Sequence, residues 1–141
     1  MIKVPPLLDE LLAAGRWPRT YEEQLAQNLR PLVSPERVKK LAPDETGIIY
    51  LYTPPFVPVG RRHDPKDFYN WPSSEPTGID YDLAIMIGDF GIGADAPIGL
   101  DYREDAINPR VIRLSYAEGG RNGRWVVMAP DFASFVEALG L

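Results

Sequence analysis

The sequence predicts an α+β domain in which N-terminal helices and a C-terminal helix pack on a mainly antiparallel sheet of about five to six strands. Apolar residues recur at helical spacing in residues 6–41 and 131–140, whereas residues 48–129 contain β-branched and aromatic runs. Most connections between these runs are too short for the crossover helices that parallel strands need. Because 141 residues is the size of one domain, we expect residues 1–141 to form a single unit.

Three helix patterns occupy the N-terminal part of the chain. The first consists of leucines on one face followed by a glycine that can end the helix, namely Leu7, Leu8, Leu11, Leu12 and Gly15. Thr20 and Glu23 form a capping box at the start of the second helix. The shared face expected for that helix is Tyr21, Leu25, Asn28 and Leu29. Ser34, followed by proline and glutamate, predicts a third helix that turns Val38 and Leu41 inward.

Strand-like runs lie between these helices and the closing one. They span residues 48–53, 81–87, 97–102, 110–116 and 124–129. The fourth run alternates apolar with polar side chains, which predicts a sheet with one buried face. Its apolar members are Ile112, Leu114 and Tyr116, and its polar members are Arg113 and Ser115.

Two further segments complete the predicted domain. Residues 54–78 hold six prolines, which cannot donate to a strand ladder, so we expect a long ordered arm or loop there. Its aromatic residues Tyr69 and Trp71 are of the kind that anchor interfaces. At the other end, Asp131 is placed to cap a closing helix that ends at Gly140. The apolar face of that helix is Phe132, Phe135, Val136 and Leu139.

The negative charge of the chain is concentrated in one segment. The net charge is −5, whereas residues 80–105 alone hold seven acids and one arginine, so the remainder of the chain sums to +1. The seven acids are Asp80, Asp82, Asp89, Asp95, Asp101, Glu104 and Asp105. Proteins that bind nucleic acid are usually basic, because neutralising phosphates supplies much of their affinity. We therefore expect no nucleic-acid partner.

Composition also bears on the compartment. The chain has no cysteine, which excludes disulfides and thiolate metal sites and agrees with a reducing cytosol. Its first residues lack the unbroken apolar region of a signal peptide, and no apolar run approaches the ~20 residues of a membrane span. We therefore expect a cytoplasmic protein with no membrane partner.

Motifs for cofactors and catalysis are weak. The series from Gly91 to Ala96 matches a dinucleotide-binding variant, but Pro97 leads into a strand rather than the helix that would hold the pyrophosphate. The carboxylates could hold magnesium or calcium, yet their spacing fits no EF-hand. His63 is the sole histidine and lies among prolines and charges, and no serine nucleophile motif is present. We expect no cofactor, no bound metal and no catalytic residue.

The second half of the chain resembles the SUKH superfamily. The series that carry the resemblance are IGDFGIGADAPIGLDYRED, NPRVIRLSY and GRWVVMAPDFASFVEALGL, within residues 79–141, and the likeness is weaker before them. The superfamily includes a fungal regulator of cell-wall synthesis and many bacterial immunity proteins of polymorphic toxin systems. The resemblance implies an α+β fold and a binding role. It also implies structural roles for turn glycines, a strand exit and core aromatics, at Gly88, Gly91, Gly93, Asp101, Arg103, Phe132 and Phe135.

These observations favour a non-enzymatic protein-binding domain, such as an immunity protein whose acidic segment covers the basic face of a toxin nuclease. The candidate partner-binding residues are Asp89, Asp95, Glu104, Asp105, Tyr69 and Trp71. Two alternatives stay open: a regulatory or scaffolding domain without a toxin partner, and a small metal-dependent enzyme that uses the Asp80–Asp105 acids.

Overall fold

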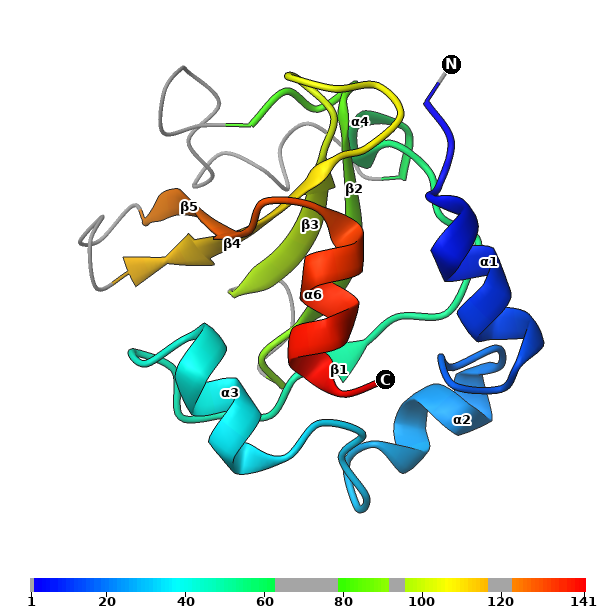
Figure 1. The fold of residues 1–141 in the computed structure, drawn as a ribbon, viewed down its shortest axis with the longest axis vertical. Coiled ribbons are helices and arrows are strands. Elements are labelled where there is room, and N and C mark those ends of the chain that lie inside the picture. The colour runs from blue at the N-terminus through cyan, green and yellow to red at the C-terminus, as the bar shows by residue number, and fades with distance from the viewer. Residues whose placement is uncertain (1, 63–78, 92–95, 117–122) are drawn as a thin grey trace.

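The computed structural model describes residues 2–62, 79–91, 96–116 and 123–141. Within these residues the strands form one five-stranded antiparallel sheet in chain order (Figure 1). Its strands are β1 (Tyr50–Leu51), β2 (Ala84–Asp89), β3 (Pro97–Asp101), β4 (Arg110–Ser115) and β5 (Arg124–Ala129). The antiparallel meander that the short connections predict is therefore confirmed, although β1 is shorter than residues 48–53.

Three of the five described helices begin at a residue whose side chain caps them. The five helices are α1 (Pro6–Ala13), α2 (Tyr21–Ala26), α3 (Pro35–Leu41), α4 (Val59–Arg62) and α6 (Phe132–Leu139). The side chains of Thr20, Ser34 and Asp131 each accept a hydrogen bond from a backbone N–H three residues later. Gly140 ends α6 with a left-handed φ of 79°, as expected from its place after the apolar face.

Helix α6 packs on one face of the sheet, and α1 flanks it (Figure 1). The apolar face of α6 is buried, and the Phe132 ring lies 6.2 Å from that of Phe135 and 5.9 Å from that of Trp17. Strand residues of the same face, including Ile98 and Leu100, complete this main core. Truncating one of these rings to alanine costs about 3–5 kcal/mol, so the closing helix is a major source of stability.

The opposite face of the sheet is also covered, which corrects the expectation of one buried face. A second apolar cluster there comprises Val59, Ile79, Ala84, Met86, Ile112, Leu114 and Trp125. On the first face, Arg113 and Ser115 are buried as well. They are tolerated because the Asp44 carboxylate pairs with the Arg113 guanidinium and accepts from the Ser115 hydroxyl at 3.0 Å. Polar residues in β4 therefore mark a buried arginine that is paired with a partly exposed carboxylate, rather than a solvated face.

Two glycines of β2 and its following turn are required by close packing. The pairing of β2 with β3 shifts register between Met86 and Gly88, and a Cβ at Gly88 would lie 2.6 Å from the Tyr50 carbonyl oxygen. Gly91 has a φ of 83°, a left-handed conformation that side chains disfavour. Gly91 thus serves the turn, whereas Gly88 lies within β2 and allows the close approach of β1, and Gly93 lies outside the described residues.

Candidate partner-binding surface

The exposed acids of the candidate segment gather at one end of the sheet. Antiparallel pairing sets Ala84 opposite Asp101, and the Tyr102 N–H donates to the Leu83 carbonyl at 2.9 Å. The start of β2 therefore lies beside the end of β3. The exposed acids at this place are Asp80, Asp82, Glu104 and Asp105, and we call them the acidic end.

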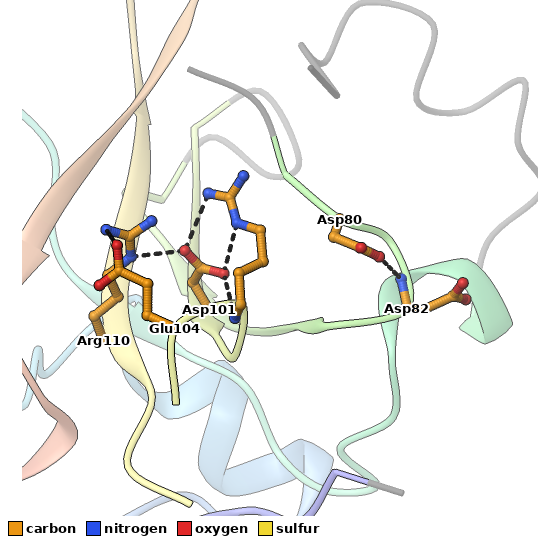
Figure 2. A network of polar contacts seen from close by, with 6 residues as sticks. Asp80, Asp82, Asp101, Glu104 and Arg110 are labelled. Carbon is orange, nitrogen blue, oxygen red and sulfur yellow. Dashed lines mark hydrogen bonds and ion pairs between the residues drawn. The ribbon is translucent and has the colours of Figure 1, made fainter. Parts of the chain in front are cut away.

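Asp101 holds the base of the acidic end together. Its carboxylate is 1% exposed and accepts from Arg103 Nε at 2.9 Å and from Arg110 Nε at 2.7 Å (Figure 2). Burial by itself raises the pKa of Asp101, but the hydrogen bonds from Arg103 and Arg110 outweigh it and hold the pKa below its ordinary value. Asp101 and Arg103 thus fix the strand exit, as the resemblance implies.

Glu104 and Asp105 present their carboxylates on the loop that follows. Glu104 is largely exposed and accepts from Arg110 at 3.1 Å (Figure 2). Asp105 accepts from the backbone N–H groups of Asn108 and Ile107, both at 2.9 Å, and these bonds lower the pKa of its carboxyl. The hydrogen bonds to the Asp105 carboxylate therefore fix the backbone conformation of the loop. Because its pKa is lowered, the Asp105 side chain is ionised at neutral pH.

An apolar side chain stands next to these two acids. Ile107 is 82% exposed, although it is one of the larger apolar residues of the chain. Because Asp105 fixes the backbone on both sides of it, the Ile107 side chain is held outward rather than folded onto the sheet. An isolated exposed isoleucine is common, but one set in a fixed loop beside two carboxylates is suited to a protein contact.

Asp80 and Asp82 lie on the turn before β2 (Figure 2). The Asp82 N–H donates to the Asp80 carboxylate at 2.9 Å. Asp82 also lines a surface pocket. That pocket has a volume of about 350 Å³ and is lined by Ile2, Pro58, Arg61, Asp82 and Leu83. The acidic end is thus bordered by an arginine on this side.

The remaining candidate residues do not add to this surface. Asp89 is buried, and its carboxylate accepts from the Tyr52 hydroxyl and from the Gly91 N–H, both at 2.6 Å. It serves the β2 turn instead of facing a partner, which corrects its place among the candidates. Asp95, Tyr69 and Trp71 lie outside the described residues.

The folded protein is less acidic at this end than the sequence window indicates. The window of residues 80–105 includes the buried Asp89 and stops before Arg110, which pairs with Asp101 and with Glu104. Around the loop itself, the carboxylates of Asp101, Glu104 and Asp105 face two guanidinium groups. The net charge that a partner meets is therefore carried mainly by Asp80, Asp82 and Asp105.

A second surface lies at α2, where the structure decides which side of the helix faces the sheet. Helix α2 turns its glutamines inward: Gln27 is 2% exposed, donates to the Leu51 carbonyl at 2.9 Å and accepts from the Leu51 N–H at 2.8 Å. Gln24 accepts from the Thr53 N–H at 2.8 Å. These amides occupy the open edge of β1, which is the first strand of the sheet.

The apolar side chains that share a face in the sequence point to solvent instead. Tyr21 and Leu25 on α2 are exposed, as are Leu29 and Leu32 in the segment that follows the helix. The signal that could have shown this was present in the sequence. Gln24 and Gln27 are three residues apart and so lie on one side of the chain, and a polar inner side suits a strand edge whose backbone groups need partners.

Two kinds of feature were sought in the described part of the chain: clusters of metal-ligating side chains and membrane-spanning helices. There, no three acidic or histidine side chains are grouped so that they could hold a metal ion. None of the helices among those residues has the length and apolar character to cross a membrane. No family model, no curated protein and no solved structure matches this chain.

Proposed function

We propose that this chain is a non-enzymatic protein-binding domain of the SUKH type, and that it binds and neutralises a bacterial toxin effector such as a nuclease. The resemblance of residues 79–141 to SUKH domains supports the binding role, and the α+β meander agrees with the fold of such domains. The toxin partner and the cytoplasmic location are part of the proposal.

The observation that carries the proposal is the fixed loop of the acidic end. Ile107 is exposed beside the carboxylates of Glu104 and Asp105, and the backbone of this loop is held by Asp105. The Asp101 pairs with Arg103 and Arg110 anchor its base. A loop that is ordered before binding loses less entropy when a partner docks, so its contacts count more fully toward affinity.

The two kinds of side chain have separate roles in this proposal. Exposed carboxylates attract a basic surface over several ångströms and so raise the association rate, chiefly at low salt. The face on which a nuclease holds its anionic substrate is such a surface. Ile107 supplies the apolar contact that becomes dry in the complex, which slows dissociation. In this proposal the exposed carboxylates determine the association rate, and Ile107 determines the dissociation rate.

The test begins with a search of the neighbouring genes for a protein with a toxic C-terminal domain, which the proposal expects, and uses that domain as the partner. Co-expression of the two should restore growth, and the purified proteins should associate in a binding assay. The double variant E104Q/D105N should slow association severalfold at low salt and much less at high salt. The amide that D105N introduces retains an acceptor oxygen for the Ile107 and Asn108 N–H groups, so the variant removes charge with the loop shape kept.

The control is D9N/E10Q, which makes the same two kinds of replacement at neighbouring exposed positions of α1. It should leave the association rate unchanged at both salt concentrations. An association rate that E104Q/D105N leaves equal to the wild type would remove the acidic end from the interface. Absence of any adjacent toxic domain, together with no growth protection, would favour the regulatory or scaffolding role instead.

A further inference from the structure

A surface pocket lies between the turn that joins α1 to α2 and the second half of α2 with the segment after it. Its volume is about 260 Å³, and its lining includes Gly15 and Pro18 from the first segment and Ala26 and Leu32 from the second. Pockets that enclose a small molecule or cofactor usually measure about 300–1,000 Å³. This pocket is therefore of a size to take one side chain of a binding partner.

The buried residues that line the pocket are Trp17, Pro18 and Gln27, and we call them the floor. The Trp17 indole N–H donates to the Tyr52 carbonyl at 2.8 Å, and the Gln27 amide is bonded to Leu51. Because these polar atoms already have partners, an apolar group suits the floor better than a polar one. The same bonds hold the floor in place before a partner binds, which lowers the entropy lost on binding.

Two exposed arginines also line the pocket. Arg16 follows α1 and Arg30 follows α2. Within residues 2–62, 79–91, 96–116 and 123–141, neither forms an ion pair. The acid of the lining, Glu23, is already paired with Arg19 at 3.0 Å. The pocket therefore carries positive charge that its lining residues do not neutralise.

An apolar floor bordered by arginines selects the chemistry of its occupant. Guanidinium groups bind carboxylates through paired hydrogen bonds, and surface arginines recur where proteins recognise acidic segments. A basic segment would be repelled, and a small inorganic anion would leave the floor uncovered. We infer that this pocket binds an acidic peptide segment of another protein, whose apolar side chain contacts the floor while its carboxylates pair with Arg16 and Arg30.

The pocket is separate from the acidic end. None of its lining residues falls within residues 80–105, and the unpaired charge of its lining is of the opposite sign. An acidic segment is attracted to this pocket and repelled by the acidic end, whereas a basic toxin surface has the opposite preference. The inference therefore does not depend on the toxin partner.

Selection from a displayed library of random linear peptides, with the full chain as bait, tests the inference. The wild type should enrich peptides in which a large apolar residue stands between aspartates or glutamates, and R16E/R30E should not. The control R61E/R124E makes the same change of net charge at exposed arginines outside the pocket, and it should enrich the same peptides as the wild type. No such enrichment by the wild type, or its retention in R16E/R30E, would overturn the proposal.

An enriched peptide that carries a fluorescent label gives the affinity by anisotropy. R16E/R30E should raise the Kd by about tenfold or more, because it replaces two attractions by two repulsions. R61E/R124E should raise the Kd much less. Added salt should weaken binding to the wild type, since both arginines are exposed and their pairs with the peptide are screened. Equal losses in the two double variants would mean that net charge, and not the pocket, attracts the peptide.

The contact with the floor is tested by filling the pocket. Ala26 and Ala13 are the exposed last residues of α2 and α1, and of the two Ala26 lines the pocket. A26F should raise the Kd of the peptide by about tenfold or more, whereas A13F should leave it unchanged. Thermal melts separate loss of binding from loss of folding. Equal Kd values for A26F and A13F would contradict an apolar contact in the pocket.

NMR spectra locate the bound peptide without any substitution. The peptide should shift the indole N–H signal of Trp17, which belongs to the floor, and leave that of Trp125, which belongs to the second apolar cluster. A peptide that binds without shifting the Trp17 signal would place the site elsewhere and overturn the proposal.

Discussion

The Gln27 side chain pairs with Leu51 as a neighbouring strand would. Its amide donates to the Leu51 carbonyl at 2.9 Å and accepts from the Leu51 N–H at 2.8 Å, so one side chain satisfies both backbone groups of an edge residue. A third bond, from Gln27 to the Gln24 carbonyl at 3.0 Å, holds the amide in this orientation. This relationship closes the edge of the sheet and decides which face of α2 is exposed.

Replacing Gln27 by leucine should destabilise the protein by about 2–3 kcal/mol. The new side chain fits by volume but leaves the Leu51 N–H and carbonyl buried without partners, each of which costs about 1–3 kcal/mol before relaxation. The free energy of unfolding from urea titration measures the loss. The control N28A lies next to it on the exposed side and should change stability by less than about 0.5 kcal/mol. Equal stability of Q27L and the wild type would mean that the edge does not depend on this amide.

The Asp44 and Arg113 pair should make stability depend on pH. The hydrogen bond from Arg113 lowers the pKa of Asp44 to about 2, against 3.8 for the free side chain. A lowered folded-state pKa contributes stability that is present above the unfolded pKa and is lost as pH falls through the folded pKa. We therefore expect about 1–2 kcal/mol to disappear between about pH 5 and pH 2.

The variant D44N isolates this contribution. At pH 7 it should be less stable than the wild type by about 1–2 kcal/mol, because the buried Arg113 loses the charge of Asp44 and retains only Glu45 at 3.9 Å. The difference should shrink on acidification as Asp44 of the wild type becomes protonated. Burial and the charge of Asp44 raise the pKa of neighbouring Glu45, which acts in the opposite direction; only the part caused by burial is common to both proteins and cancels when they are compared at each pH. A difference that stays constant down to pH 2 would contradict the assignment.

Replacing Asp101 by asparagine should cost about 2–4 kcal/mol and loosen the acidic end. The guanidinium groups of Arg103 and Arg110 would face a neutral amide at a site that is 1% exposed. Chemical denaturation measures the stability, and amide hydrogen exchange at Ile107 measures the order of the loop. D105N is the matched control, since the same substitution at an exposed position keeps the acceptor for its two backbone bonds. Similar losses in both variants would count against Asp101 as the anchor.

Replacing Gly88 by alanine should destabilise the protein by about 1–3 kcal/mol through overpacking. The added Cβ would lie 2.6 Å from the Tyr50 carbonyl oxygen, so β1 and β2 must separate locally. In G60A the nearest atoms to the new Cβ lie at 3.4 Å, and helix α4 gains a better helix former. Thermal melts should therefore show a lower midpoint for G88A and no such decrease for G60A. A G88A midpoint equal to that of the wild type would mean that the two strands adapt.

The caps, core faces and strand order of the fold follow from the sequence because they depend on local chemistry. Thr20, Ser34 and Asp131 accept the bonds that their positions predict, and the apolar face of α6 is buried as its spacing indicates. One detail differs: the Glu23 carboxylate accepts from the Arg19 N–H at 3.2 Å, one residue before the expected partner. Short connections left the strands few ways to pair, which is why the meander could be predicted directly.

The sites depended on neighbours that are distant in the chain. In the sequence, Asp89 and Glu104 are both acids with no sign of their environment. In the fold, Asp89 is buried and accepts from the Tyr52 hydroxyl, whereas Glu104 is exposed and pairs with Arg110. Ile107 is an ordinary loop residue until the bonds from Asp105 hold it outward. Charge counted along the sequence could not show which carboxylates meet arginines in space.

By itself, then, the sequence determined the order of the main helices and strands, the caps and the buried face of α6, since these rest on spacing and capping within a few residues. Only the tertiary structure decided the short helix α4, the exact strand bounds and which side of α2 faces the sheet. Tyr21, Leu25 and Leu29 share a helix face by periodicity alone, but Gln27 reaching Leu51, 24 residues away, turned that face outward. A backbone edge that needs hydrogen bonds outweighed the usual burial of leucine, and no local pattern reveals which edge a helix will meet.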